Sequence, residues 1–265
     1  GHDGIVVNGT TGEAPTTTDA EKRMIVEAVR EAVGPNIKIV AGVGTYDTAH
    51  SVRLAGQAEQ AGADALLAVT PYYSRPSQTG LVQHFLRLAD ATDLPVMIYD
   101  IPPRSAVHLE LGTLVELARH ERIVAVKDAT GQAGAAFEKM AATNLAYYAG
   151  DDLLGLAFLA VGGSGVVSVV GHVAGDLWRR VIDAVDRADL PAARQAMARM
   201  LPVINAVLGS GQGAVMIKAA LEIAEILPRR TVRLPLAEAT ESEAGHVRRA
   251  LAASGLGPGH PASAP

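Results

Sequence analysis

The chain has 265 residues and a net charge of −5, from 23 basic and 28 acidic side chains. Its 49% hydrophobic content can form a large core, and its mild acidity offers no electrostatic surface for nucleic acid or an anionic membrane. The absence of cysteine excludes disulfides, thiol nucleophiles and cysteine metal sites, and it fits a cytoplasmic protein. No apolar run of about 18 residues predicts a membrane span, and residues 1–7 do not resemble a signal peptide.

Seven short apolar runs, most of them rich in β-branched residues, recur along the first 170 residues. They cover residues 5–7, 37–40, 65–69, 96–99, 123–126, 145–148 and 166–170. Each run is nearly continuous rather than alternating, which is typical of a parallel strand that is buried on both faces.

Amphipathic helical patterns separate these runs. Thr18 with Glu21 forms a capping box, and the helix that it opens is expected to end at Gly34, while Asp47 is expected to cap a second helix. Further helices are predicted over residues 78–91, 109–120, 133–142 and 151–160. From His172 onward the pattern indicates consecutive helices, with breaks at 189–191, 209–213 and 228–235.

Strands that alternate with helices indicate βαβ units, so the sequence predicts an α/β fold, a (β/α)8 TIM barrel with a C-terminal helical extension. A doubly wound open sheet is the alternative. Because only seven strands are found, the barrel is expected to lack its first βα unit. The predicted division is a barrel over 1–172, the extension over 173–254 and a flexible tail over 255–265.

Chemistry-bearing side chains follow the predicted strands. In parallel α/β folds, functional sites form at the carboxyl ends of strands. The segments at these ends are 8–13, 42–47, 70–73, 99–104, 127–130 and 150–152. Hydroxyl groups, two adjacent tyrosines, one arginine and one lysine are therefore expected to converge on one rim.

Lys127 is the leading candidate for a nucleophile. It ends a strand that is otherwise almost wholly apolar, where burial would disfavour the ammonium form and lower the pKa of the amine. A neutral amine can attack a ketone and form a Schiff base. The alternative is a strand-end lysine that reaches solvent or pairs with Asp128.

Other rim residues have both a functional and a structural interpretation. The turn at Thr10 and Thr11 could hold a carboxylate or could simply lead into a helix. Tyr99 could relay protons or could lie at the edge of the core. Arg104 could bind a substrate carboxylate or form a surface ion pair. Tyr72 and Tyr73 could be site residues or interface aromatics. The eight histidines show no metal-ligand spacing, so no metal site is expected.

These motifs, taken together, resemble the pyruvate-dependent class I aldolases, and within that superfamily the dihydrodipicolinate synthases. The motifs are Gly9-Thr10-Thr11-Gly12-Glu13, Thr70-Pro71-Tyr72-Tyr73, Tyr99-x-Ile-Pro-x-Arg104, Val126-Lys127-Asp128 and Gly150-Asp151-Asp152. The resemblance extends from Gly1 to about Leu251. It implies a lyase with a TIM barrel fold that needs neither a metal nor an organic cofactor.

The resemblance also implies roles for the site residues. Lys127 would form a Schiff base with pyruvate, whose carboxylate Thr11 would bind. Tyr99, Thr10 and Tyr73 would relay protons, with Tyr73 supplied across a dimer interface.

The second substrate implied is L-aspartate 4-semialdehyde, with its carboxylate held by Arg104. Gly150 and the carbonyl of Val167 would line the pocket. The product would be 4-hydroxy-tetrahydrodipicolinate, a step of lysine and diaminopimelate biosynthesis in the cytoplasm. Members of this group are commonly homotetramers, assembled as dimers of dimers.

Some positions depart from the pattern of this group. Asp100 and Pro103 stand where asparagine and glycine are common. The pocket through which lysine inhibits sensitive members reads here as Asp19, Lys22, Tyr46 and His50, so weak or absent inhibition by lysine is expected.

Two alternatives to the synthase remain. One is a lyase of the same superfamily acting on a 2-keto-3-deoxy sugar acid, a sialic acid or 4-hydroxy-2-oxoglutarate. The other is a barrel homologue without catalytic activity. Arg104 favours the synthase over the sugar-acid lyases, which generally lack this residue.

Overall fold

Seven parallel strands form one sheet whose spatial order follows the order of the chain. The strands are β1 (Gly4–Val7), β2 (Lys38–Gly42), β3 (Ala65–Val69), β4 (Val96–Asp100), β5 (Ile123–Asp128), β6 (Ala146–Ala149) and β7 (Gly165–Val166). In this computed structural model, which describes residues 1–256, the strands belong to a compact unit formed by Asp3–Gly9 and Thr17–Val167, here called the sheet unit. A doubly wound sheet would reverse its strand order at a switch point, so the sequential order supports the barrel-type prediction.

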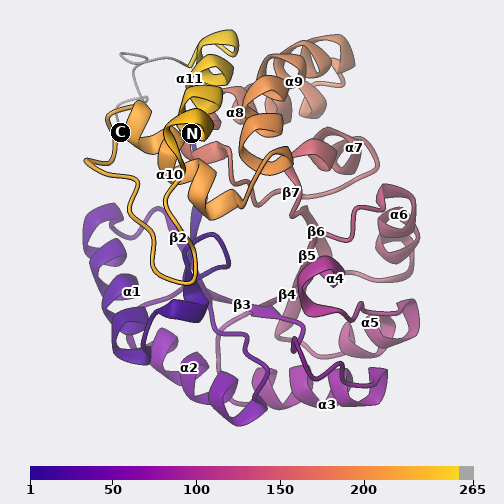
Figure 1. Cartoon of the computed structure of the whole chain (residues 1–265). Helices are drawn as coiled ribbons and strands as arrows, with labels where there is room; N and C mark the ends of the chain where they lie inside the picture. The colour runs from indigo at the N-terminus through magenta and orange to yellow at the C-terminus, as the bar shows by residue number, and fades with distance from the viewer. Residues whose placement is uncertain (257–265) are drawn as a thin grey trace. The chain divides into compact units, whose positions relative to one another are not determined.

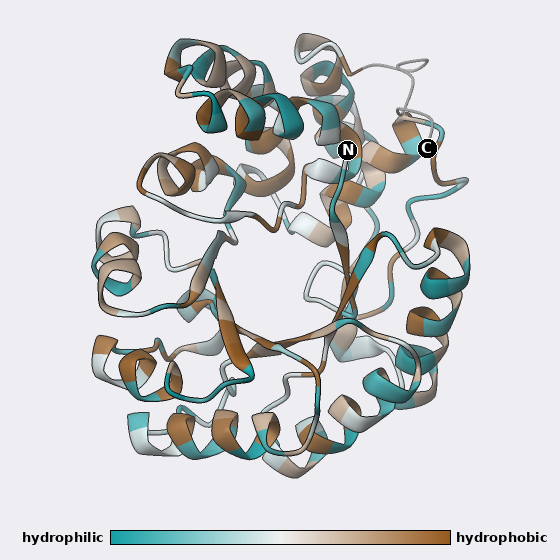
Figure 2. Cartoon of the chain, turned by 180° about the vertical axis from the view of Figure 1, so that it is seen from behind, coloured by the Kyte–Doolittle hydropathy of each residue, from teal (hydrophilic) through white to brown (hydrophobic). Residues whose placement is uncertain are grey.

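Helices line the outside of the curled sheet (Figure 1). They are α1 (Asp19–Val33), α2 (Thr48–Gln60), α3 (Gln78–Ala89), α4 (Pro102–Ser105), α5 (Leu111–Leu117), α6 (Ala133–Ala142) and α7 (Gly155–Ala160), with a 3-10 turn η2 (Asp152–Leu154) before α7. Figure 2 shows hydrophobic residues concentrated in the strands and alternating with hydrophilic ones along the helices. This is the pattern of amphipathic helices packed on an apolar sheet.

The predicted helix ends of α1 and α2 are confirmed. Thr18 and Glu21 form both halves of a capping box, and Gly34 follows the last turn of α1 with φ of 68°. The Asp47 side chain accepts a hydrogen bond from the first turn of α2. These caps satisfy backbone groups that have no partner within the helix. They fix where each helix begins and therefore which face meets the sheet.

Two elements differ from the sequence prediction. The last strand is two residues long rather than five, because Ser168 Oγ accepts a hydrogen bond from the Gly171 amide (2.7 Å) and turns the chain into the next helix. A continuous apolar run does not by itself distinguish a strand from a buried turn. The short helix α4 was not predicted, because its first two residues are prolines, which are tolerated only in the first turn of a helix.

A second compact unit, here called the helical unit, comprises Gly1–His2, Thr10–Thr16 and the described residues from Ser168 onward. It contains η1 (Ala14–Thr16), α8 (Gly171–Asp186), α9 (Leu190–Ile204), a π-helical turn η3 (Asn205–Gly209), α10 (Gly213–Ile223) and α11 (Glu241–Ala253). The three predicted breaks between consecutive helices are confirmed. Residues 257–265, most of the predicted tail, lie outside the described residues.

Candidate active site

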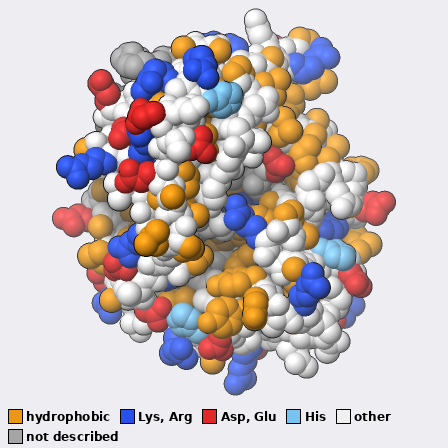
Figure 3. Space-filling view, viewed as in Figure 1, with side chains coloured by type: hydrophobic (Ala, Val, Ile, Leu, Met, Phe, Trp, Pro, Cys, Tyr) orange, Lys and Arg blue, Asp and Glu red, His pale blue; other side chains and the backbone are white. Residues whose placement is uncertain are grey.

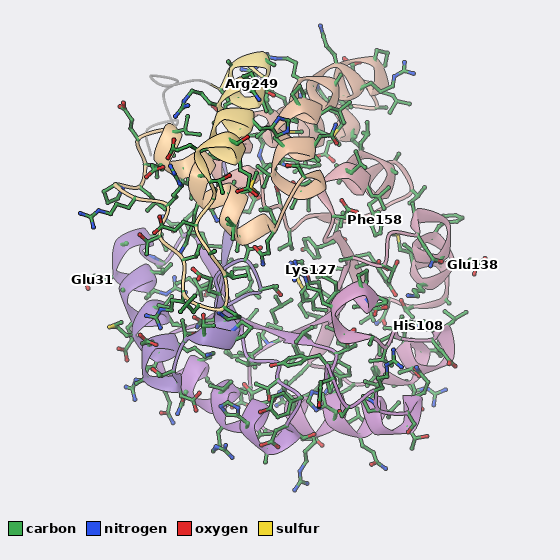
Figure 4. All side chains as sticks on the ribbon, viewed as in Figure 1. Glu31, His108, Lys127, Glu138, Phe158 and Arg249 are labelled. Carbon is green, nitrogen blue, oxygen red and sulfur yellow. The ribbon has the colours of Figure 1, made fainter. Side chains whose placement is uncertain are left out.

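Tyr99 and Lys127 face the inside of the curled sheet from neighbouring strands. They are register partners between β4 and β5, and the Lys127 Nζ lies 4.1 Å from the centroid of the Tyr99 ring. Figure 4 shows Lys127 within the curve of the sheet, whereas Glu31 and Glu138 project from the outer helices. Successive side chains of a strand alternate between its two faces. Because Tyr99 and Lys127 point inward, the residues that follow them, Asp100 and Asp128, point toward the helices.

Burial lowers the pKa of Lys127 to about 8. The nearby carboxylate of Asp152 acts in the opposite direction, and the positive charge of Arg104 lowers the pKa further. With this pKa, about one molecule in ten carries Lys127 as a neutral amine at pH 7, far more than for an ordinary lysine. This is the protonation state that attacks a carbonyl carbon, so the structure provides a reactive nucleophile.

The absence of a side chain at Gly150 leaves space for the Lys127 side chain. A Cβ atom at this position would lie 3.0 Å from Lys127 Cγ and 3.1 Å from the Asp128 carbonyl oxygen. The Gly150 amide donates a hydrogen bond to that carbonyl (2.7 Å), which fixes the backbone in place. Only glycine fits here without displacing the lysine.

Arg104 lies in α4, directly after the Tyr99 strand, and its side chain is exposed. The helix is anchored by Ser105, whose buried hydroxyl donates to the carbonyls of Ile101 (3.0 Å) and Val107 (2.7 Å). Val167 is held beside β6, because its amide donates to the Ala149 carbonyl (2.8 Å). Arg104 is thus presented to solvent from a fixed segment, close enough for its charge to act on Lys127.

Tyr73 projects into solvent from the sheet unit. Its side chain is 93% exposed, and its backbone has φ of 72°, an uncommon conformation for a residue other than glycine. The preceding Tyr72 instead packs edge-on against Tyr46, with ring centroids 5.5 Å apart. The structure therefore does not bring Tyr73 into the pair formed by Tyr99 and Lys127.

Thr10 and Thr11 belong to the helical unit. The carbonyl of Thr10 accepts a hydrogen bond from the Glu13 amide (3.1 Å), which closes a turn around Thr11. The roles predicted for these two threonines stay predictions.

Asp152 is a residue whose role the sequence did not reveal. The neighbouring Asp151 caps the 3-10 turn η2, since it accepts a hydrogen bond from the Leu153 amide (2.9 Å). Asp152 is 2% exposed and acts electrostatically on Lys127. The sequence signal that could have identified Asp152 as a site residue was its position two residues after Gly150, at the end of β6.

A buried charge cluster on the helix side of the sheet was also missed. Asp100 and Asp128 are register partners one residue beyond the inward pair, and both are almost fully buried. Lys139 of α6 lies between them, with Nζ 3.4 Å from Asp100 Oδ2 and 4.0 Å from Asp128 Oδ2. Burial, opposed by the charge of Lys139, raises the pKa of Asp100. The cluster joins α6 to the two strands that carry Tyr99 and Lys127.

On the face shown in Figure 3, acidic and basic side chains are interspersed rather than gathered into one basic patch. Within residues 1–256, the helices are too short or too polar to cross a bilayer. Over the same residues there is no group of three or more histidine or acidic side chains suited to a metal ion.

Known proteins resemble this chain over nearly its whole length. The dihydrodipicolinate synthetase family matches residues 1–254. A 4-hydroxy-tetrahydrodipicolinate synthase of Kineococcus radiotolerans is 52% identical over 258 residues, which cover 97% of this chain and 84% of that protein. A dihydrodipicolinate synthase from Aquifex aeolicus has a TM-score of 0.94 at 32% identity, covering 98% of this chain and 89% of its own.

A further solved structure bears on assembly. It is a monomeric dihydrodipicolinate synthase variant, with a TM-score of 0.93 at 31% identity over 96% of this chain and 86% of its own. Sequence and fold agree, and the chain belongs to the dihydrodipicolinate synthetase family.

Proposed function

We propose that this chain is a lyase of the class I aldolase type that condenses pyruvate with L-aspartate 4-semialdehyde to 4-hydroxy-tetrahydrodipicolinate. The observation that carries the proposal is the Lys127 amine, whose pKa is lowered to about 8 and which lies 4.1 Å from the Tyr99 ring. The names of the relatives support the same substrates. The reaction would supply lysine and diaminopimelate biosynthesis.

The first half of the reaction activates pyruvate. The Lys127 amine attacks C2 of pyruvate, and loss of water gives an iminium, whose positive charge makes the C3 protons acidic. Removal of one C3 proton gives the enamine. Tyr99, Thr10 and Tyr73 would relay these protons, and Thr11 would bind the pyruvate carboxylate.

The second half joins the two substrates. The enamine carbon attacks the aldehyde carbon of the semialdehyde, whose carboxylate Arg104 would hold, and the resulting alkoxide takes up a proton. The substrate amine then adds to the iminium carbon and expels Lys127 as a free amine, which closes the ring. Gly150 and the carbonyl of Val167 would line the pocket in which these steps take place.

Trapping with borohydride tests the chemistry. Incubation with pyruvate and borohydride should add one reduced pyruvate to the intact protein, and peptide mapping should place it on Lys127. The matched control is Lys38, a lysine on β2 that is 66% exposed at its side chain, and Lys38→Ala should still be trapped. Absence of an adduct on the wild type would reject the Schiff-base mechanism and leave a barrel homologue without this activity.

A comparison of acceptors decides the substrate. The condensation rate with L-aspartate 4-semialdehyde should exceed any cleavage of 2-keto-3-deoxy sugar acids, sialic acid or 4-hydroxy-2-oxoglutarate. Faster turnover of one of the latter compounds would assign the chain to another branch of the superfamily.

The assembly proposed is a homo-oligomer, a dimer of dimers in the cytoplasm, in which Tyr73 reaches a neighbouring subunit. The 93% exposure of Tyr73 and its left-handed backbone support this, because an exposed aromatic residue held in an unfavourable conformation is typical of an interaction site. Sedimentation of wild type and Tyr73→Glu should show a larger species only for the wild type. A monomeric wild type would reject the proposal.

The finer fold proposed is a (β/α)8 barrel over residues 1–172, without its first βα unit, followed by a helical extension over 173–254. Seven strands in sequential parallel order support it, since eight close such a barrel.

A further inference from the structure

Glu13 combines an unfavourable backbone conformation with a buried charge. Glu13 is 7% exposed, and its backbone φ is 57°, in the left-handed region. For a residue other than glycine this conformation is unfavourable, and such residues persist where their surroundings hold them. The left-handed backbone of Glu13 must therefore be held by contacts with other parts of the protein.

Those contacts come from residues more than 200 positions further along the chain. The Arg233 amide donates to Glu13 Oε1 (2.7 Å), and the Lys218 ammonium donates to Oε2. Lys218, on α10, also donates to the Thr231 carbonyl (2.7 Å), so one ammonium joins the carboxylate to the segment that follows α10. Both carboxylate oxygens of Glu13 are thus occupied.

The backbone of Glu13 holds the loop on either side of it. Its amide donates to the Thr10 carbonyl (3.1 Å), and its carbonyl accepts from the amide (2.9 Å) and the hydroxyl (3.0 Å) of Thr16. The Arg233 guanidinium donates to the Thr16 carbonyl (3.0 Å). The loop from residue 10 to 16 is therefore tied to α10 and the segment after it through the Glu13 carboxylate and the Arg233 guanidinium.

We propose that Glu13 is a positioning residue, which, held by Lys218 and Arg233, sets the conformation of the turn that presents Thr10 and Thr11 to pyruvate. This inference rests on the proposed function, in which Thr11 binds the pyruvate carboxylate. Loss of the anchor should release the left-handed turn and weaken carboxylate binding more than it slows the chemical step at Lys127.

The charge state of Glu13 is consistent with this role. Burial alone would raise the pKa of Glu13, but the hydrogen bonds from the Arg233 amide and the Lys218 ammonium outweigh burial and lower it. The carboxylate is therefore ionised in the neutral range. Removing Lys218 would take away the ammonium that pairs directly with this buried anion.

Steady-state kinetics with pyruvate as the varied substrate test the proposal. Glu13→Gln and Lys218→Met should each raise the KM for pyruvate by about tenfold or more, with a smaller loss in kcat, as expected when binding rather than chemistry is impaired. Lys218→Arg, which keeps a cation, should restore KM to within about threefold of the wild type. KM does not depend on the fraction of folded enzyme, so partial unfolding would lower only the maximal rate.

Glu225 provides the matched control. It is a glutamate of the helical unit with φ of 60°, but its side chain is exposed. Glu225→Gln should leave KM unchanged. If the wild type traps pyruvate but Glu13→Gln and Lys218→Met keep the wild-type KM, the positioning role is wrong and the proposed function stands. Equal KM values for Lys218→Met and Lys218→Arg would also reject the role. If the wild type traps no pyruvate, it is the proposed function that fails.

Discussion

The Lys127 ammonium nitrogen lies 4.1 Å from the centroid of the Tyr99 ring, across the parallel pairing of β4 and β5. The negative face of an aromatic ring attracts a cation, which favours the charged lysine, whereas burial favours the neutral amine. Burial outweighs the favourable contacts, since the pKa of Lys127 falls to about 8. The pair can therefore supply both a nucleophile and, through the phenol, a proton donor.

Tyr99→Phe separates these two contributions. The variant keeps the ring over Lys127 and loses only the hydroxyl, so we expect borohydride trapping of pyruvate to persist. We expect kcat for condensation to fall by about 10²–10⁴, the range associated with loss of a general acid–base group. The measurement is trapping stoichiometry by mass spectrometry beside the steady-state rate. A variant with wild-type kcat would show that the Tyr99 hydroxyl moves no proton.

The rate of Schiff-base formation should depend on pH through Lys127. The reactive form is the free amine, so the rate of trapping at saturating reductant should rise as pH increases and level off above about 8. Arg104 lowers the pKa of Lys127, so Arg104→Met should move this midpoint to higher pH. Asp152 acts in the opposite direction, so Asp152→Asn should move the midpoint lower. Midpoints that move together in one direction would contradict this electrostatic account.

The parts of this molecule that were predictable follow periodic patterns. The strand that carries Lys127 could be predicted because the four residues before the lysine, 123–126, form a continuous apolar run, which is typical of a parallel strand buried on both faces. The pairing of Asp100 with Lys139 could not, because a contact between residues 39 positions apart leaves no local signal. The anchor of Glu13 at Arg233 is invisible for the same reason.

Gly150→Ala should damage the site by displacing the nucleophile. The added Cβ would lie 3.0 Å from both Lys127 Cγ and the Ala129 Cβ. We expect stability to fall by about 1–3 kcal/mol from overpacking, and the trapping rate to fall by about tenfold or more. The measurements are urea unfolding and trapping kinetics.

Gly56→Ala is the control for that substitution. Gly56 lies inside α2, and a Cβ there would meet no atom within 4 Å. We expect it to gain about 0.5–1 kcal/mol of stability from helix propensity and to keep wild-type trapping. Equal trapping by both alanine variants would show that the Lys127 side chain can move without loss.

Lysine should inhibit weakly or not at all. At three of the four positions predicted to bear on lysine binding, Asp19, Lys22 and His50, the polar groups already have hydrogen-bond partners. His50 Nε2 lies 2.9 Å and 3.0 Å from the two oxygens of the Asp19 carboxylate, and the Lys22 ammonium donates to the Thr17 hydroxyl (2.9 Å). An incoming lysine cation would face the cation of Lys22, with the nearby carboxylate already paired. A titration of the initial rate should stay flat, and half-inhibition at sub-millimolar lysine would contradict this expectation.

The buried cluster behind the site should control stability. Lys139→Met would leave Asp100 and Asp128, both almost fully buried, without a counter-charge. Breaking such a pair costs about 3–5 kcal/mol, so the free energy of unfolding in urea should fall by that amount. The conservative Lys139→Arg should lose less, because a cation remains.

Asp100→Asn tests the same cluster through its pH dependence. The pKa of Asp100 is raised in the folded state above its ordinary value of 3.8, chiefly by burial. Its protonated form therefore stabilises the fold below that value, and this contribution is lost as pH rises through the folded pKa. Asparagine cannot ionise, so the variant should gain stability relative to the wild type between pH 4 and 7. Urea unfolding at both pH values measures the difference, and a difference that does not change with pH would show that Asp100 is ionised throughout, with Lys139 as its full counter-charge.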